Sequence, residues 1–231
     1  MKLRSLFLTM AMGLATGLTH AVTLKVANQG DAQSMDPHSL NELLQLTFTN
    51  NIYEPLIARD KQLGLTPGLA TKWTQTQPTV WRFELRKGVN FHDGTPFTAD
   101  DVVFSFGRAA GPGSDMQGYT SSFKEVRKID AHTVEIETLT PFPILPDVVT
   151  GVFMLSKQWC EVNKATTPVD RRKGIENAAS FRANGTGPYR LKERQPSVRT
   201  VLVRNGTYWG KVEGNVTEVI FTPIGHWLAP C

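Results

Sequence analysis

The sequence has little cysteine, and this scarcity already limits how the protein can be stabilised. Its 231 residues contain two cysteines, Cys160 and Cys231, and no C-x-x-C pair. A disulfide framework and a cysteine-based zinc site both need more thiols than this. Cys160 and Cys231 could still pair in an oxidising compartment. We therefore expect the fold to rest on a hydrophobic core, for which the length and the 40% apolar content are ample.

The sequence also lacks the short motifs that mark common catalytic sites. It contains no G-x-S-x-G, no H-E-x-x-H and no strand followed by G-x-G-x-x-G. His92 and Asp93 are neighbours in a turn, so their side chains are not expected to face one site. The five histidines are dispersed along the chain, which argues against a preformed metal site. We therefore expect neither an enzyme nor a bound cofactor or metal.

An excess of one charge is missing as well, and this argues against a nucleic-acid partner. The formal net charge is +4, with basic residues scattered along the sequence. Arg171, Arg172 and Lys173 form a basic triplet, and a triplet of this kind is usually a solvated loop. We expect no nucleic-acid binding.

The first 21 residues have the pattern of an export signal. Lys2 and Arg4 give a positive start, an apolar run covers residues 6–18, and residues 19–21 resemble a cleavage site. The run is short and rich in small residues for a membrane span, although an uncleaved anchor is the alternative. Cleavage near Ala21 would remove two basic residues and no acidic one, so the charge would fall to +2. No cysteine follows for lipid attachment, so we predict a periplasmic protein.

The stretch from Trp81 to Arg108 contains a strand, a turn and a helix. Residues 81, 83 and 85 are apolar and alternate with charged residues, which is the pattern of a half-buried strand. The run HDGTP at residues 92–96 indicates a tight turn. Thr98 is expected to cap the helix together with Asp101, three residues later. The stripe of this helix that we expect to be buried consists of Val102, Val103, Phe106 and Ala110.

Hydrophobic patterns predict further elements around this stretch. A first strand is expected at residues 23–27 and a helix at residues 41–56. Asp36, in the run SMDPH, is expected to cap that helix. Residues 126–129 and 133–138 are expected to form a hairpin with three loop residues.

A second distinctive run is NGTGPY at residues 184–189. Its glycines permit backbone geometry that other residues resist, and its proline fixes the start of a strand. Strands are expected at residues 189–194 and 199–204, on either side of a short turn. The run NGTYWG follows at residues 205–210.

These motifs together resemble one known family. Residues 69–73 read LATKW, and residues 83–105 read FELRKGVNFHDGTPFTADDVVFS. This is similar to the signature region of the bacterial extracellular solute-binding proteins of family 5, the peptide and nickel receptors of ABC importers. The GTGPY and YWG runs resemble two later motifs of the same family. So many fixed positions rarely coincide by chance.

The resemblance implies an α/β fold of the type II periplasmic-binding-protein kind. It has mixed sheets, packed helices and an extra lobe, and this chain would hold only part of it. The first lobe would contain residues 22–56 and the returning residues 181–224. The second lobe, a scaffold with the signature region, would contain residues 57–180. Residues 225–231 do not resemble the family, so we expect an atypical tail and a truncated or frameshifted receptor.

The resemblance also implies where a ligand would be bound. In the family, the residues before the SMDPH run line the cleft, which makes Asp31, Ala32 and Gln33 candidate contacts. Asp31 could meet a peptide's amino group, and the exposed main chain could pair with a peptide as an added strand. Tyr119 and Thr186 are two further candidates. Their alternative roles are a packing tyrosine and a structural crossover turn.

The function implied is that of a periplasmic receptor without catalytic activity. It would capture di- or oligopeptides and deliver them to an ABC permease in the inner membrane, and we expect it to be a monomer. The alternative is a remnant without a transport function, which has a structural role or interacts with a partner.

Overall fold

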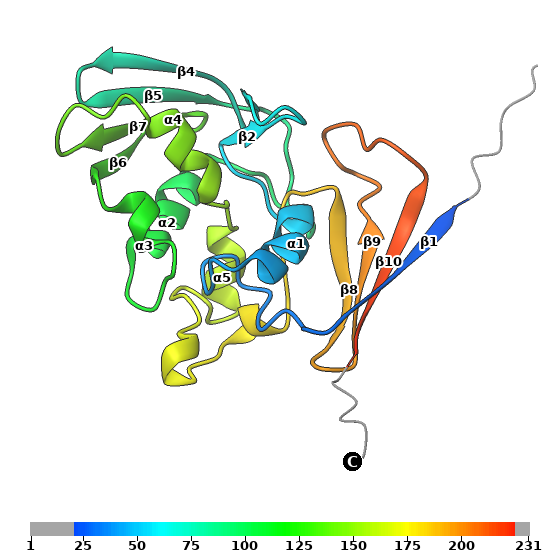
Figure 1. Ribbon diagram of the computed structural model, residues 1–231. Coiled ribbons are helices and arrows are strands. Elements are labelled where there is room, and N and C mark those ends of the chain that lie inside the picture. The colour runs from blue at the N-terminus through cyan, green and yellow to red at the C-terminus, as the bar shows by residue number, and fades with distance from the viewer. Residues whose placement is uncertain (1–20, 225–231) are drawn as a thin grey trace, which may run out of the picture.

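The computed structural model describes residues 21–224, which form two four-stranded sheets with helices between them (Figure 1). The predicted signal peptide, apart from Ala21, and the predicted tail lie outside the described residues. Within residues 21–224, no helix is long and apolar enough to cross a membrane. In chain order the strands and helices are β1 (Val22–Asn28), α1 (Leu43–Ile52), β2 (Ile57–Arg59), β3 (Leu65–Pro67), β4 (Ala70–Gln77), β5 (Val80–Leu85), α2 (Ala99–Ala110), α3 (Gln117–Thr120), β6 (Phe123–Asp130), β7 (Thr133–Thr138), α4 (Leu145–Val148), α5 (Lys157–Val162), β8 (Tyr189–Gln195), β9 (Arg199–Arg204) and β10 (Val216–Pro223).

The two large sheets differ in how their strands are connected. One sheet has the order β4-β5-β7-β6 and is antiparallel throughout. The other has the order β1-β10-β9-β8, in which β1 runs parallel to β10 and the remaining pairs are antiparallel. β2 and β3 form a small two-stranded sheet. The mixed sheets and packed helices confirm the predicted fold class.

Strand β5 has the alternating burial that its sequence predicts. Phe83 and Leu85 are buried, whereas Arg82 and Glu84 between them are exposed. The alternation arises because successive side chains of a strand point to opposite faces of the sheet. One face of β5 therefore packs on the core, and the other meets solvent.

Helix α2 begins where the sequence predicts, but two residues of the predicted buried stripe are not buried, since Val103 is only partly buried and Ala110 is exposed. The N–H of Thr98 donates to the Asp101 carboxylate at 2.9 Å, so the expected cap is present. Val102 and Phe106 are buried, whereas Ala110 is exposed and Ala109 is buried in its place. In an α-helix, residue 109 lies about 20° around the axis from residue 102, and residue 110 about 80°. The prediction for Ala110 was therefore wrong.

Two other boundaries differ from the predictions. Helix α1 is shorter than residues 41–56, because Glu42 caps it by accepting from the N–H groups of Leu44 and Gln45, and the chain is extended at Tyr53. Asp36 is therefore not its cap. The β6–β7 hairpin has two loop residues rather than three, since Asp130 pairs with Thr133.

The buried apolar residues form two clusters. The first cluster lies between the β4-β5-β7-β6 sheet and α2, and it contains Phe83 and Phe106. The second joins α1, α5 and the sheet of β1, with Phe48 and Phe221 in edge-to-face contact. Residues of the predicted second lobe also pack in the second cluster, among them Phe153, Leu155, Cys160, Ala165 and Ala179.

The corrected stripe of α2 can be tested with two neighbouring alanines. Ala109→Lys would force a charged side chain into the core, so we expect a loss of about 3 kcal/mol or more in the free energy of unfolding. Ala110→Lys should change it by only about 0.5 kcal/mol, because Ala110 is exposed. Urea unfolding followed by circular dichroism measures both, and equal losses would contradict the burial described.

Candidate ligand-binding site

The predicted contact Asp31 lies against the β8–β9 hairpin. Both of its carboxylate oxygens accept from Arg194, at 2.8 and 2.9 Å, and one also accepts from the N–H of Ser197 at 2.8 Å. The carbonyl of Ala32 accepts from the same guanidinium. The Asp31 side chain is 15% exposed and that of Arg194 is 2% exposed. The charge of Asp31 is thus largely balanced inside the protein.

Residues 30–33 contain main-chain N–H groups without a hydrogen-bond partner among the described residues. Gln33 is exposed, while Ala32 is buried. Within residues 21–224, the N–H groups of Gly30, Asp31, Ala32 and Gln33 have no hydrogen-bond acceptor. The segment of residues 30–33 therefore follows β1 as a run of unpaired main-chain donors.

The segment is fixed at its far end by the side chain of Gln45 in α1. The Gln45 carbonyl oxygen accepts from the N–H of Ser34 at 3.1 Å. Its amide nitrogen donates to the Asp36 carbonyl and to the hydroxyl of Ser39, both at 3.1 Å. Gln45 is fully buried. Residues 30–33 are consequently held between Arg194 on one side and Gln45 on the other.

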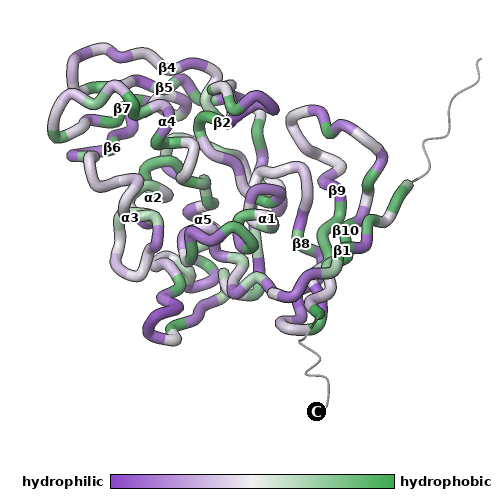
Figure 2. Tube along the Cα trace, in the orientation of Figure 1, coloured by the Kyte–Doolittle hydropathy of each residue, from purple (hydrophilic) through white to green (hydrophobic). Residues whose placement is uncertain are grey.

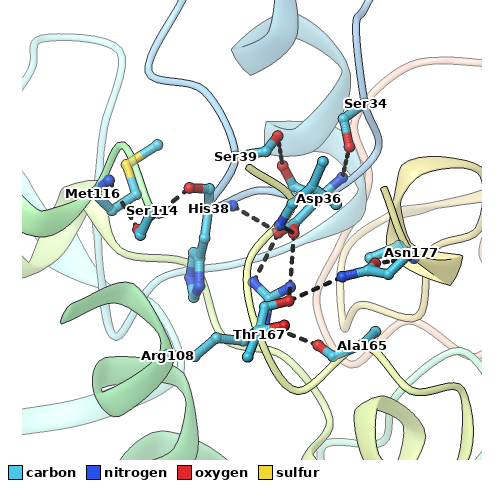
Figure 3. Close-up of polar contacts among 12 residues, drawn as sticks. Ser34, Asp36, His38, Ser39, Arg108, Ser114, Met116, Ala165, Thr167 and Asn177 are labelled. Carbon is cyan, nitrogen blue, oxygen red and sulfur yellow. Dashed lines mark hydrogen bonds and ion pairs between the residues drawn. The ribbon is translucent and has the colours of Figure 1, made fainter. Parts of the chain in front are cut away.

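Asp36 and Arg108 form a buried ion pair behind this segment (Figure 3). Two nitrogens of Arg108 donate to the two carboxylate oxygens of Asp36, at 2.8 and 2.7 Å, and both side chains are 0% exposed. Asp36 also accepts from the N–H groups of His38 and Val169. Burial alone would raise the pKa of Asp36, but the charge and hydrogen bonds of Arg108 outweigh it and lower this pKa.

The remaining donors of Arg108 reach the loop after α5. They donate to the carbonyls of Ala165 and Thr167, both at 3.0 Å. One guanidinium therefore joins α2, the SMDPH loop and residues 165–169. The sequence analysis missed this pair, since Asp36 was assigned to a helix cap and Arg108 only marked the end of α2. An arginine on the buried side of an amphipathic helix was the signal that could have revealed it.

Thr186 lies in a tightly packed turn rather than at the surface. Its side chain is fully buried, and its hydroxyl donates to the Glu54 carboxylate at 2.7 Å. A Cβ atom on Gly185 would lie 1.9 Å from the carbonyl oxygen of Ile52, so only glycine fits. Contact between Thr186 and a ligand would require the surrounding residues to move.

The Glu54 carboxylate binds residues of the GTGPY and YWG runs, which are far from Glu54 in the sequence. Besides Thr186, it accepts from the Tyr208 hydroxyl at 2.7 Å and from the Trp209 indole nitrogen at 2.8 Å. Partial burial raises the pKa of Glu54, while these donors act to lower it. The guanidinium of Arg86 stacks on Trp209 at 4.1 Å. Glu54 and the GTGPY and YWG runs therefore share one polar junction.

His92 and Asp93 tie the signature turn to the same GTGPY run. His92 Nε2 donates to the carbonyl of Gly187 at 3.0 Å, and Asp93 exchanges two hydrogen bonds with the amide of Asn184. Burial lowers the pKa of His92 to about 4, so its ring is neutral at pH 7. The hydrogen bonds of His92 and Asp93 therefore go to different residues of the NGTGPY run.

Tyr119 is a half-buried residue of α3. Its hydroxyl accepts from the Asn41 amide at 3.4 Å. Its ring packs over Gly151, where a Cβ atom would lie 2.4 Å from Cε1 of the tyrosine. No hydrogen bond or ion pair within residues 21–224 joins Tyr119 to Asp31 or Thr186. Asp31, Ala32 and Gln33 are neighbours in the sequence, and among the described residues neither Tyr119 nor Thr186 has a hydrogen bond to them.

The described residues offer no metal site or reactive thiol. No group of three His, Cys, Asp or Glu side chains within residues 21–224 could hold a metal ion. Cys160 is buried, and burial raises the pKa of its thiol to about 12. Cys231, with which Cys160 could pair in an oxidising compartment, lies outside the described residues. The basic residues 171–173 form one helical turn and pair with Glu176, Asp115 and Asp170.

The buried ion pair can be tested by removing its cation. Arg108→Met would leave the Asp36 carboxylate buried without a counter-charge, and we expect a loss of about 3–5 kcal/mol in the free energy of unfolding. The control is Arg59→Met, because Arg59 pairs with Asp147 at the surface and should contribute less than about 1 kcal/mol. A loss at Arg108 no larger than at Arg59 would contradict this role.

His92 should make the protein less stable as the pH falls below neutrality. Its pKa is about 4 in the folded chain against 6.5 ordinarily, so between these values the unfolded chain binds a proton that the folded chain does not. Fully buried His38 has a similarly lowered pKa, again mainly through burial, and acts in the same direction.

We expect His92→Gln to flatten the fall in the free energy of unfolding between pH 7 and pH 4, while His38 preserves part of it. Urea unfolding at a series of pH values measures this slope for the variant and the wild type. An unchanged slope would show that His92 does not titrate as described.

A comparison with family models and curated proteins identifies relatives over most of the chain. The model described as bacterial extracellular solute-binding proteins, family 5 Middle, matches residues 64–229 and so reaches into the predicted tail. The dipeptide-binding protein of Escherichia coli (strain K12) is 30% identical, over 87% of this chain and 40% of its own length. The periplasmic oligopeptide-binding protein OppA of the same strain is 27% identical, over 93% and 42%.

Solved structures agree with this result. DppA from Helicobacter pylori, in complex with the peptide STSA, matches with a TM-score of 0.74 and 25% identity, over 88% of this chain and 43% of its own. NikZ from Campylobacter jejuni, in complex with Ni(L-His), has the same TM-score at 23% identity and supports the fold alone. The chain spans about two fifths of the length of these relatives. It belongs to the bacterial extracellular solute-binding proteins of family 5.

Proposed function

We propose that this chain provides ligand-binding surface of a periplasmic receptor for di- or oligopeptides that works with an ABC importer and has no catalytic activity. The observation that carries the proposal is the run of unpaired N–H donors at residues 30–33. A peptide in extended conformation offers carbonyl oxygens at the spacing of a strand, and such donors can bind them. The names of the relatives, which include oligopeptide-binding and dipeptide-binding proteins, support the same ligand class.

The rigidity of the segment favours this role. Arg194 holds Asp31 and Ala32, and Gln45 holds Ser34, so the donors do not have to be ordered when a peptide binds. Binding to an ordered surface avoids part of the entropy cost of association. Because Arg194 already neutralises Asp31, we assign the main contacts to the main chain and to the exposed side chain of Gln33. Tyr119 and Thr186 remain predicted contacts.

The proposal includes export and a membrane partner. Residues 1–21 would direct the chain to the periplasm and be removed near Ala21, in keeping with relatives that are named periplasmic. The bound peptide would then pass to an ABC permease in the inner membrane.

The test measures peptide binding and its dependence on one main-chain donor. Calorimetric titration with a panel of di- to pentapeptides should show binding by the wild-type chain. Gln33→Pro removes the N–H of residue 33 and should weaken binding about tenfold or more. Gln33→Ala keeps this donor and should have a smaller effect.

Two outcomes would oppose the proposal. If the folded wild-type chain binds no peptide of the panel at millimolar concentration, peptide capture is wrong for this chain. If Gln33→Pro and Gln33→Ala bind equally well, the main chain of residue 33 is not a contact. The melting temperature of each variant, measured without peptide, shows whether it is folded.

A further inference from the structure

The carboxylate of Asp31 is occupied by partners inside the protein. Nη1 of Arg194 donates to both of its oxygens, at 2.8 and 2.9 Å, and the N–H of Ser197 donates to one of them at 2.8 Å. A carboxylate can accept about four hydrogen bonds, and most of this capacity is already used. The Asp31 side chain is 15% exposed. A further donor would therefore find little of this carboxylate free.

Arg194 is held in place by more than Asp31. β8 ends in hydrophilic residues, at positions 192–195, at the lower end of its sheet in Figure 2. The guanidinium of Arg194 also donates to the hydroxyl of Thr200, a fully buried residue of β9, at 2.8 Å and to the carbonyl of Ala32. Its side chain is 2% exposed, and a guanidinium keeps its charge at any ordinary pH. Moving Arg194 away from Asp31 would leave this buried charge unpaired, which is unfavourable.

This pairing changes what Asp31 can do with a peptide's amino group. An ammonium group near Asp31 would be attracted by the carboxylate and repelled by the guanidinium, which lies within hydrogen-bond distance of that carboxylate. The two effects nearly cancel when both charges are at similar distances from the ammonium. A direct contact would also require the N–H of Ser197 or the guanidinium to give up a hydrogen bond. Asp31 therefore offers an amino group little advantage over a neutral group.

The main chain beside Asp31 favours carbonyl groups of a ligand. The N–H groups of residues 30–33 have no acceptor among the described residues, whereas the carbonyl of Ala32 already accepts from Arg194. The segment thus complements ligand acceptors better than ligand donors. An acyl group on a peptide's amino terminus replaces the charged ammonium by a neutral amide with one further carbonyl. Acylation therefore removes a group that Asp31 does not favour and adds an acceptor that the segment can bind.

We propose that Arg194 makes this subsite indifferent to the charge of a peptide's amino terminus, so that N-acylated peptides bind residues 30–33 as well as peptides with a free amino group. Arg194 is then a specificity-determining residue that acts by neutralising Asp31 rather than by touching the peptide. This role rests on the proposed function and names the class of peptides that the site accepts. It differs from the expectation that Asp31 meets the amino group.

A pair of matched peptides tests this role. Calorimetric titration at pH 7 with trialanine and N-acetyl-trialanine gives the ratio of the two dissociation constants for each variant. We expect the two peptides to bind the wild-type chain within about threefold of each other. Arg194→Met leaves the charge of Asp31 unbalanced and should favour trialanine by about tenfold or more, because a charge-assisted hydrogen bond is stronger than a neutral one. A structural defect alone would weaken the binding of both peptides and leave the ratio unchanged.

Further variants separate charge from structure. Arg194→Lys keeps a positive charge beside Asp31 and should return the ratio to that of the wild type. Arg190→Met removes the same charged group from an exposed position on the same strand, and it should leave the ratio unchanged. Asp31→Asn should also leave the ratio near that of the wild type, and this variant keeps the test decisive if Arg194→Met does not fold. The melting temperature without peptide shows which variants are folded.

The outcomes distinguish this role from the proposed function. A wild-type preference for trialanine of about tenfold or more that Asp31→Asn abolishes would show that Asp31 binds the amino group, and it would overturn this role alone. An unchanged ratio in folded Arg194→Met would also overturn it, because Arg194 would then not determine specificity. If the wild-type chain binds neither peptide, the segment does not capture peptides, and both the proposed function and this role are wrong.

Discussion

The ion pair between Asp36 and Arg108 is the interaction on which the arrangement of the chain depends. Burying two charges is unfavourable unless each finds its partners, and here the partners come from three segments of the chain. The pair therefore specifies the relative position of the SMDPH loop, α2 and residues 165–169. The unpaired donors of residues 30–33 follow from it, because they lie at the start of the loop that the pair and Gln45 hold in place. In the proposed function, the peptide would therefore meet a segment that is already ordered by the side chains of Asp31 and Gln45.

The local elements could be predicted from the sequence because local chemistry determines them. The alternation in β5 and the cap of α2 depend on residues within a few positions of each other. The end of the buried stripe of α2 was misplaced by one residue, because near the end of a helix the pattern alone does not say whether residue 109 or 110 meets the core. The family and the fold class could also be predicted, since the signature region is dense in fixed residues.

The parts that could not be predicted are those that depend on tertiary contacts. Glu54 accepts from Thr186, Tyr208 and Trp209, which are more than 130 positions away, and no local pattern indicates this junction. Asp31 was predicted to meet a peptide's amino group, and no pattern in the sequence indicated its pairing with Arg194, which is 163 positions away. Thr186 was a natural candidate in a glycine-rich turn, and only the packing of that turn on α1 reveals that its side chain is buried.

The pairing of β1 with β10 has a consequence for the time course of folding. Thr23 and Glu218 are 195 positions apart, so this sheet closes only when both ends of the described chain meet. The sheet of β4 to β7 is built from neighbouring hairpins, and contacts between nearby residues form faster than distant ones. The β4-β5-β7-β6 sheet should therefore form first, before β1 pairs with β10. During that interval both edges of β1 are open to other chains, so the folding yield should fall as protein concentration rises.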